Sequence, residues 1–312
     1  MLPQVTIAIP AYKIKFLSKA INSVLGQTFQ DFELIIVNDK SPEDITSIVN
    51  AFNDSRIRYF INEKNIGSKD PVQNWNKCLS YARGKYFSLL CDDDLYEPTF
   101  LEDMLRLKNK YPDVKVFRSR VKVIDSEDNV ISYYPSSPEY ESCYEYMWHK
   151  LNWYRRQTIS EFFYETDHIR NKGGYVAMPK AWGADDISCF NFSHENGIVT
   201  TNKLLVCFRM SGTNISTNND KEIKEKVYAH VLYKQKIDDL LNNCLDTTLK
   251  VQIIKAKEDN FKKQVLWCLR LSSITDFISL YRFRRDEIGS ILFLKAFLYK
   301  IIIIQQICNL QC

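Results

Sequence analysis

The sequence predicts an α/β protein with a mostly parallel central sheet flanked by helices, followed by a helical C-terminal region. In the N-terminal third, short apolar runs alternate with segments of helical spacing, which is the pattern of a parallel sheet with helices on its faces. After residue 220 the chain has no proline and keeps a helical pattern to its end. The middle, residues 118–215, is less regular.

Four apolar runs predict the strands of the sheet. Each is short and bounded by turn residues, as buried strands are, and they lie at 5–9, 33–37, 56–61 and 86–90. In a parallel sheet, ligands bind outside the carboxyl ends of the strands. Polar residues follow three of these runs, namely Tyr12, Asp39 and the acidic run of Asp92, Asp93 and Asp94. We therefore expect three separate segments to converge on one edge of the sheet.

Helices are predicted between these strands. Residues 17–25 carry apolar side chains at the spacing of one helical face. Residues 41–52 have a helical pattern, with Ser41 as the N-cap and Pro42 at the first helical position. A third helix passes through Trp75 before the fourth strand begins. The middle region adds a hairpin around 127–129, a helix at 140–156 and a strand at 203–208.

Composition and charge narrow the class of protein. The formal net charge of +4 is too mild to indicate nucleic-acid binding, so no nucleic acid is expected as a partner. The nine cysteines show no CxxC pair or zinc-like Cys/His spacing, which favours buried thiols in a reducing compartment. The apolar run near the N-terminus has the length of a strand and lacks the features of a signal peptide. We therefore expect a cytoplasmic globular protein.

Carboxylates at a strand end suit a hard divalent cation. Mg²⁺ and Mn²⁺ prefer oxygen ligands, and Mg²⁺ typically binds one or two carboxylates together with substrate phosphates. Because successive side chains of a strand point to opposite sides, we expect the acidic run to divide between a sugar hydroxyl and a metal. In isolation such a run is more often a solvated loop or the start of a helix. Its place after a buried strand, near Tyr12 and Asp39, favours a ligand site.

The sequence resembles the inverting glycosyltransferases of family 2, which have the Rossmann-like GT-A fold and include enzymes of bacterial polysaccharide and cell-envelope glycan synthesis. The matching segments are 5–13 (VTIAIPAYK), 20–39, 65–67 (NIG) and 74–101, and more weakly 174–186 and 207–216. The resemblance implies a GT-A catalytic domain at 1–217 and a helical region at 218–312. Within the catalytic domain it implies a nucleotide-sugar half at 1–117 and an acceptor half at 118–217.

The resemblance implies a donor site for a nucleotide sugar, with a UDP-sugar as the expected donor. Pro10, Ala11 and Tyr12 would line the nucleotide pocket. Asp39 would accept a hydrogen bond from the base, which we expect to be uracil. Lys69, near the 65–67 turn, would meet the base or a phosphate.

The acidic run departs from the family pattern in one position. The common pattern is Asp-x-Asp-Asp, and Cys91 occupies its first position here. The resemblance implies that Asp92 approaches the ribose and that a metal, Mn²⁺ or Mg²⁺, bridges the diphosphate. Whether Asp93 or Asp94 is the main metal ligand stays open. A histidine that many members carry after the late arginine is missing, and Arg209 is expected to contact the diphosphate or the acceptor instead.

On the acceptor side, the resemblance indicates Asp185 and Asp186. Inversion needs a carboxylate that takes the proton of the attacking hydroxyl. We expect Asp186 to be this base, with Asp185 as a helix cap or as a second catalytic carboxylate. Trp182 would form a floor for the acceptor sugar, although a lone tryptophan suits a hydrophobic core at least as well. The acceptor is expected to be a glycan or a lipid-linked molecule.

The C-terminal segment at 288–304 is strongly apolar but too short to cross a membrane as a helix. The lysines and arginines near it favour anionic lipid headgroups, so one interpretation places the helix on the inner face of the cytoplasmic membrane. Packing on the catalytic domain or at a homodimer interface explains the same pattern equally well.

Two other functions compete with transfer of a sugar. One is a relative with a degenerate site that binds a nucleotide sugar or acts as a scaffold, which Cys91 and the missing histidine support. The other is a nucleotidyltransferase, which would be expected to have a glycine-rich phosphate loop after the first strand. The segment PAYKIKFL contains no glycine, so this alternative ranks last.

Overall fold

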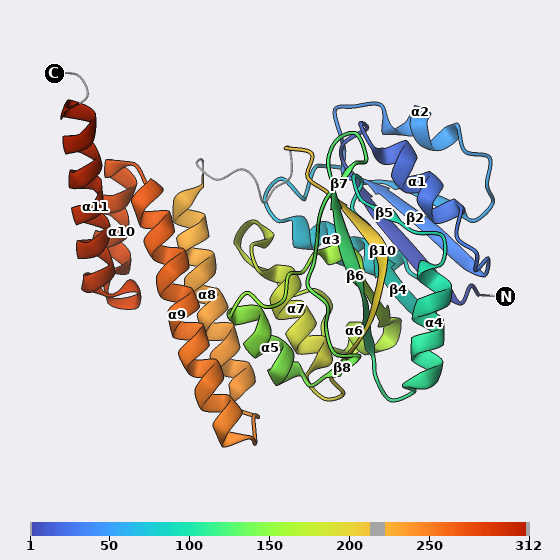
Figure 1. Ribbon diagram of the computed structural model, residues 1–312. Coiled ribbons are helices and arrows are strands. Elements are labelled where there is room, and N and C mark those ends of the chain that lie inside the picture. Colours follow the sequence, from blue (N-terminus) through green and yellow to red (C-terminus); the bar gives the residue numbers. More distant parts are fainter. Residues whose placement is uncertain (1, 213–221, 310–312) are drawn as a thin grey trace.

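The structure is a computed structural model that describes residues 2–212 and 222–309, with side chains described as far as residue 302. It is a mixed α/β protein with one central sheet and a helical C-terminal region, as the sequence predicts (Figure 1). The expected boundary at 217/218 lies outside the described residues.

Four parallel strands form the N-terminal half of the sheet. They are β1 (Val5–Ala11), β2 (Phe32–Asn38), β3 (Ile57–Ile61) and β4 (Tyr86–Leu89), in the spatial order β3-β2-β1-β4. Side chains along β1 alternate between the two faces: Val5, Ile7 and Ile9 enter one hydrophobic cluster, whereas Ala8 enters the other. All four predicted strands are therefore confirmed.

The sheet continues through strands of mixed direction. The order after β4 is β9 (Phe162–Glu165), β6 (Val116–Ile124), β10 (Ile198–Arg209) and β5 (Leu95–Tyr96). β9 is antiparallel to both of its neighbours, whereas β6 and β10 are parallel. Two short strands, β7 (Val130–Tyr133) and β8 (Tyr140–Glu141), pair at the margin. β10 begins earlier than the expected strand at 203–208.

Helices cover both faces of the sheet (Figure 1). One face carries α1 (Leu17–Leu25), α2 (Ile45–Asn50) and α4 (Phe100–Lys110), and the other carries α3 (Pro71–Tyr81), α5 (Cys143–Leu151), α6 (Thr166–Asn171) and α7 (Ala184–Ser193). Both clusters are closely packed aliphatic and aromatic side chains, so the sheet is rigid where it supports the site.

Two expected helices start elsewhere. α2 begins at Ile45 with Asp44 as its N-cap, so the expectation of Ser41 as the cap is wrong. Ser41 instead donates a hydrogen bond from Oγ to the carbonyl oxygen of Tyr12 at 2.6 Å, which ties two strand ends together. α5 is shorter than the expected 140–156 and begins with a capping box between Ser142 and Glu145.

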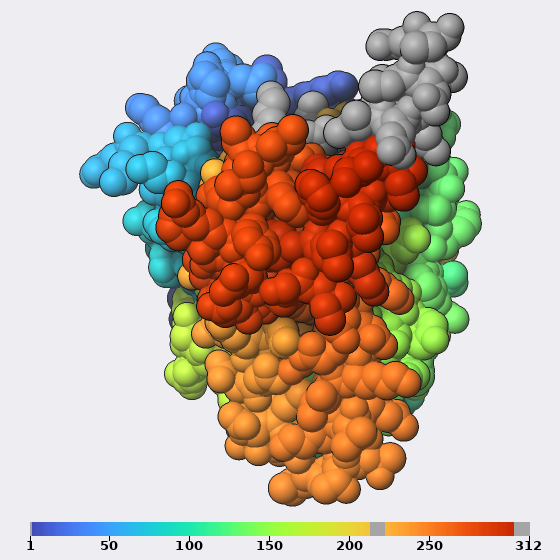
Figure 2. Space-filling view, turned by 90° about the vertical axis from the view of Figure 1, so that its left-hand side faces the viewer, coloured from blue at the N-terminus to red at the C-terminus, as the bar shows by residue number. Residues whose placement is uncertain are grey.

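Four helices form the C-terminal region: α8 (Ile223–Leu241), α9 (Thr247–Leu271), α10 (Ile274–Ile288) and α11 (Ser290–Asn309). α8 and α9 form a long antiparallel pair beside α5 and α7, whereas α10 and α11 lie at the outer side (Figures 1 and 2). A third hydrophobic cluster joins α8 to α11. Within the described residues, we find no helix with the length and apolarity needed to cross a membrane.

Candidate active site

Three strand ends meet at one edge of the sheet, as the sequence predicts. β1 pairs in parallel with β2 and with β4, so that Ala11 lies opposite Asn38 and Ala8 lies opposite Leu89. The segments that follow these strands carry Tyr12, Asp39 and the acidic run. Pro10 and Ala11 are the last residues of β1 and form the floor of this edge.

Asp92 braces the end of β1. Its Oδ2 accepts hydrogen bonds from the backbone N–H groups of Tyr12 at 2.7 Å and Lys13 at 2.8 Å. Burial raises the pKa of Asp92 to about 6, while these two hydrogen bonds oppose the rise. Asp92 thus fixes the backbone beside Tyr12, whose half-exposed side chain stays accessible at the edge.

Asp39 orders the 65–67 turn. Its carboxylate accepts hydrogen bonds from Nδ2 of Asn62 at 2.8 Å and from the backbone N–H groups of Ile66 at 3.0 Å and Gly67 at 2.7 Å. A Cβ on Gly67 would lie 2.7 Å from Oδ2 of Asp39, which explains why a glycine stands here. The turn that the sequence predicts around Gly67 is therefore held by a site residue.

Asp94 lies in the interior of the protein, where both of its carboxylate oxygens have hydrogen-bond partners. It is fully buried, and its Oδ2 accepts a hydrogen bond from Oγ of Ser160 at 2.6 Å while its Oδ1 accepts one from the backbone of Arg209 at 2.9 Å. Burial, and next the charge of Asp93, raises the pKa of Asp94 to about 8. Both oxygens of Asp94 hold the surrounding chain together.

Asp93 contacts Ser211, which donates a long hydrogen bond of 3.4 Å from Oγ to Oδ2 of Asp93. Burial raises the pKa of Asp93, and the charge of Lys13 opposes this rise. Ser211 follows Arg209 by two residues, so it lies in the segment where the sequence lacks the expected histidine.

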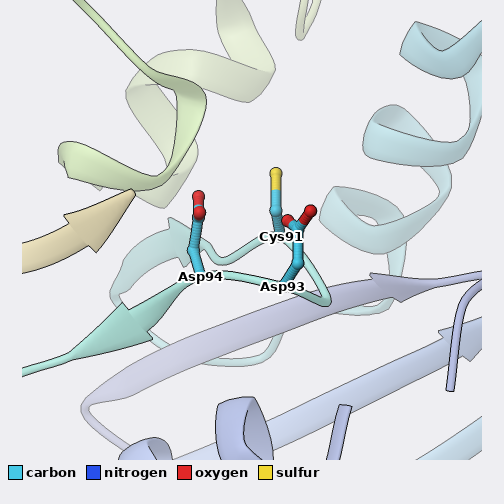
Figure 3. A group of neighbouring side chains, drawn as sticks. All are labelled: Cys91, Asp93 and Asp94. Carbon is cyan, nitrogen blue, oxygen red and sulfur yellow. The ribbon is translucent and has the colours of Figure 1, made fainter. Parts of the chain in front are cut away.

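Cys91, Asp93 and Asp94 form a group with metal-ligand side chains. Their ligand atoms all lie within 4.8 Å of one another, and the three side chains point to the same side of the turn after β4 (Figure 3). Burial, followed by the charges of the neighbouring carboxylates, raises the pKa of the Cys91 thiol well above its usual range. A neutral thiol is a poor ligand for a hard cation, so the oxygen ligands suit Mg²⁺ or Mn²⁺ better than Cys91 does.

Arg209 lies inside the protein, and the expectation that it faces the diphosphate or the acceptor is corrected. It is fully buried, and its Nε donates to the carbonyl oxygen of Asp93 at 2.8 Å. Its Nη1 donates to the carbonyl oxygen of Asp125 at 2.8 Å, and its Nη2 lies 2.6 Å from Oδ1 of Asp128. The guanidinium carbon also lies 4.2 Å from the ring centroid of Phe16. Arg209 therefore holds the acidic run in place from the interior of the protein.

The acidic pair Asp185 and Asp186 begins α7. Gly183, with φ of 74°, is the N-cap, and Asp185 lies in the first turn, where its carboxylate accepts hydrogen bonds from the backbone N–H groups of Asp185 and Asp186. Nζ of Lys150 lies 3.1 Å from Oδ1 of Asp186, and the hydroxyl of Tyr233 donates to Oδ2 at 3.1 Å. Burial, and next the charge of Asp186, raises the pKa of Asp185 to about 7.

Tyr134 connects the acidic pair with the acidic run. It is buried, and its pKa is raised first by burial and then by the charges of Glu161, Asp94 and Asp185. Charges from the acidic run and from the acidic pair thus act on the same tyrosine.

Two further expected residues lie beside the site. Trp182 is partly buried, and Nζ of Lys226 lies 4.8 Å from its ring centroid. Lys69 is exposed and lines a hollow of about 280 Å³ with Asp70 and residues 177–180. Neither contact excludes the expected role.

Sequence reasoning missed several residues that shape the site. Ser160, in the 3-10 helix η1 (Ile159–Glu161), donates to Asp94 and accepts a hydrogen bond from the backbone N–H of Cys91 at 3.1 Å. Lys150 and Tyr233 position Asp186, and they come from α5 and α8. Nothing in the local sequence around these residues indicates their roles, because each acts across a long separation in the chain.

The fold and the site together define a class, the glycosyltransferases with the GT-A fold. The chain belongs to glycosyl transferase family 2, since the model of that family matches residues 6–177, more than half of the sequence. This finding confirms the resemblance that the sequence motifs indicate.

Solved structures agree with this assignment at the level of the fold. The 1–349 chain of TarS from S. aureus, in complex with UDP-GlcNAc, matches with a TM-score of 0.66 over 97% of this chain and 92% of that chain. The sequences are 14% identical, so this likeness concerns the fold alone.

Curated relatives match about a third of the chain. An uncharacterized glycosyltransferase of Rickettsia typhi is 36% identical over 109 residues, which are 35% of this chain and 33% of the relative. A Campylobacter jejuni enzyme named GalNAc(5)-diNAcBac-PP-undecaprenol beta-1,3-glucosyltransferase is 34% identical over 96 residues, 30% of each chain. The chain thus aligns with about a third of the length of these relatives.

Proposed function

We propose that the protein transfers a sugar from a UDP-sugar to a glycan or lipid-linked acceptor with inversion at the anomeric carbon. The observation that carries this proposal is the convergence of Tyr12, Asp39 and Asp93 on the carboxyl edge of the sheet. A TarS chain of the same fold has been solved with UDP-GlcNAc, and the Campylobacter relative is named as acting on an undecaprenol-linked glycan. Both support the choice of donor and acceptor class.

In the donor site, Tyr12 would pack beside the base and Asp39 would accept a hydrogen bond from it. Pro10 and Ala11 would line the pocket, and Lys69 would meet the base or a phosphate from the exposed side. Asp39 already holds the turn at Gly67, so the base would bind against a preorganised surface.

The residues of the acidic run fit a divalent cation. Mg²⁺ commonly binds one or two carboxylates and completes its shell with substrate phosphates and water. Asp93 would supply the main ligand oxygen, because both oxygens of Asp94 already accept hydrogen bonds from the protein. A bound Mn²⁺ or Mg²⁺ would neutralise charge that develops on the leaving diphosphate. Lys13, whose charge acts on Asp93, would add to this effect.

Asp186 would act as the general base. The acceptor oxygen attacks the anomeric carbon and loses its proton to the Asp186 carboxylate, while the bond from the anomeric carbon to the diphosphate breaks and its electron pair leaves with UDP. Lys150 forms an ion pair with Asp186, and the hydrogen bond from Tyr233 fixes the orientation of the carboxylate. Asp185 would act as the second carboxylate of the pair.

We propose the same division of the chain that the sequence indicates. Residues 1–217 would form the catalytic domain, with donor binding in 1–117 and acceptor binding in 118–217, and residues 218–312 would contact the inner face of the cytoplasmic membrane. Exposed apolar side chains on α10 and α11, including Ile278, Leu294 and Leu298, support a peripheral membrane contact.

A donor-turnover assay tests this function. The full chain is incubated with a panel of UDP-sugars and Mn²⁺, and release of UDP is followed. We expect slow hydrolysis of one donor, which depends on the metal and is lost in Asp186→Asn. Binding of UDP without turnover of any donor would indicate instead a relative that binds nucleotide sugars but does not transfer them.

A further inference from the structure

A hollow of about 450 Å³ lies between α9 and the loop that follows α5. Trp153, Lys263, Gln264 and Trp267 line it. Both tryptophans are exposed to solvent, with relative exposures of 58% for Trp153 and 43% for Trp267. Large aromatic side chains that stay exposed beside a hollow are characteristic of binding surfaces.

One stripe of α9 forms the wall of this hollow. Asn260, Lys263, Gln264 and Trp267 stand at the spacing i, i+3, i+4 and i+7, and therefore share one helical face. Nδ2 of Asn260 donates to the carbonyl oxygen of Leu151 at 3.0 Å, at the end of α5. This hydrogen bond fixes the width of the hollow, because the loop with Trp153 begins directly after Leu151.

The opposite wall is fixed by the end of α5. Trp153 has φ of 66°, the left-handed conformation of the residue that follows the C-cap of α5. The backbone N–H groups of Trp153 and Tyr154 donate to the carbonyl oxygens of Lys150 and His149, which ends the helix and fixes the position of Trp153. The Trp153 side chain remains in solvent and does not join the core.

Contacts through Lys150 and Lys226 link the hollow to the segment that carries the acidic pair. The backbone N–H of Trp153 donates to the carbonyl oxygen of Lys150 at 3.1 Å, and Lys150 pairs with Asp186. On the other side, Nζ of Lys226 lies 4.8 Å from the ring centroid of Trp182 and 5.9 Å from that of Trp267. Two short paths of contact thus connect the hollow with the segment that carries the acidic pair.

We propose that this hollow binds a sugar unit of the acceptor glycan at a distance from the hydroxyl that is glycosylated. The inference rests on the proposed function, because it assigns a substrate contact to the same acceptor side. The faces of Trp153 and Trp267 pack against the apolar C–H face of a sugar ring. Nζ of Lys263 and the amide of Gln264 hydrogen bond with its hydroxyl groups.

The proposal explains why polar and aromatic side chains alternate around the hollow. Binding of a protein partner or a lipid surface would need a larger and more continuous apolar patch on this protein, such as the one on α11. A sugar ring has one apolar face and a rim of hydroxyl groups, which matches two tryptophans with an amide and an amine between them. The protein would therefore select an oligosaccharide acceptor over a monosaccharide.

An array of bacterial surface oligosaccharides, probed with the full chain in the presence of UDP and Mn²⁺, tests this proposal. The wild type, Trp153→Ala, Trp267→Ala and the control Phe283→Ala are compared. Phe283 is exposed on α10 and does not line the hollow. We expect the wild type and the control to bind at least one glycan equally, and each tryptophan variant to bind it about tenfold more weakly.

The stabilisation of each variant by UDP, measured as a thermal shift, distinguishes the possible failures. Each variant is expected to keep the wild-type shift, which also shows that it folds. A retained shift without any bound glycan, or with glycan binding unchanged in both tryptophan variants, overturns the acceptor subsite and leaves the donor site standing. Loss of the UDP shift in the wild type itself overturns the proposed function and this inference with it.

Discussion

Neighbouring carboxylates in the acidic run have different partners, and these partners determine what each can do. Asp92 accepts two backbone N–H groups from the end of β1, and Asp94 accepts Ser160 and the backbone of Arg209. Ser211 donates a hydrogen bond to Asp93. In the second acidic pair, Asp186 contacts Lys150 and Tyr233.

Replacement of each carboxylate on α7 by an amide separates the roles of Asp185 and Asp186. We expect Asp186→Asn to lower kcat by about 10²–10⁴ with little change in the donor KM, because it removes the proton acceptor and keeps the shape. Asp185→Asn should have a smaller effect. Steady-state kinetics with a saturating acceptor measures both. If Asp185→Asn causes the larger loss of kcat, the base has been assigned to the wrong carboxylate.

A methyl group at Gly67 should weaken nucleotide binding. The added Cβ of Gly67→Ala would meet Oδ2 of Asp39 at 2.7 Å, so the turn or the carboxylate must move. We expect the Kd for UDP to rise about tenfold, an energy of about 1.4 kcal/mol. Gly173→Ala is the control, because a Cβ there has no neighbour within 4 Å although its φ of 87° strains the backbone. An equal rise in both variants would mean that general destabilisation is responsible.

At the scale of elements, the site is built from segments that lie far apart in the sequence. The strands β1, β2 and β4 deliver the donor residues, and η1, α5 and α8 supply Ser160, Lys150 and Tyr233. The strand–helix alternation and the strand ends could be predicted from sequence, because periodicity and turn residues are local signals. The inserted antiparallel β9 and the supporting residues could not, because they depend on contacts between distant segments.

Protonation of His230, which lies on the same helix as Tyr233, should lower the stability of the folded protein in acid. Burial, and next the charge of Lys226, lowers the pKa of His230 to about 4 in the folded protein. The unfolded chain gains this proton near pH 6.5, so the stability from His230 is complete above about pH 6.5 and is lost as the pH falls towards about 4.

Denaturant unfolding at pH 7.5 and pH 5 measures this effect. We expect the wild type to lose about 1–2 kcal/mol more between these values than His230→Gln, because the variant has no imidazole to protonate. The free energies at pH 7.5 serve as the reference for each protein. Parallel pH profiles for the two proteins would contradict the assignment to His230.

At the scale of the whole molecule, the α10–α11 pair lies on the outside of the protein (Figure 2). It leaves large apolar side chains exposed to solvent. Ile291, Leu294 and Leu298 lie on one face of α11, at the spacing of neighbouring turns. Lys295 lies among them and is also exposed. The sequence predicts this helix but leaves its partner open, because burial, membrane contact and self-association all require the same apolar pattern.

Co-sedimentation with vesicles tests the membrane contact. We expect the full chain to sediment with anionic vesicles and much less with neutral ones, since lysine and arginine side chains add to apolar insertion. Leu294→Glu should abolish sedimentation, whereas Ile131→Glu, at an equally exposed position on β7, should not. If the protein does not sediment with either kind of vesicle and forms a dimer in solution, this face serves self-association and not membrane contact.

The central claim is that the turn after β4 binds a nucleotide diphosphate through a metal held by Asp93. The most direct test is calorimetric titration of UDP into the full chain with and without Mn²⁺, for the wild type, Asp93→Asn and the control Asp103→Asn. Asp103 is similarly buried but pairs with Arg106 and Lys203 on α4 and β10. We expect Mn²⁺ to strengthen UDP binding in the wild type and in the control, and to have no effect in Asp93→Asn. Equal strengthening by Mn²⁺ in all three proteins would contradict the claim.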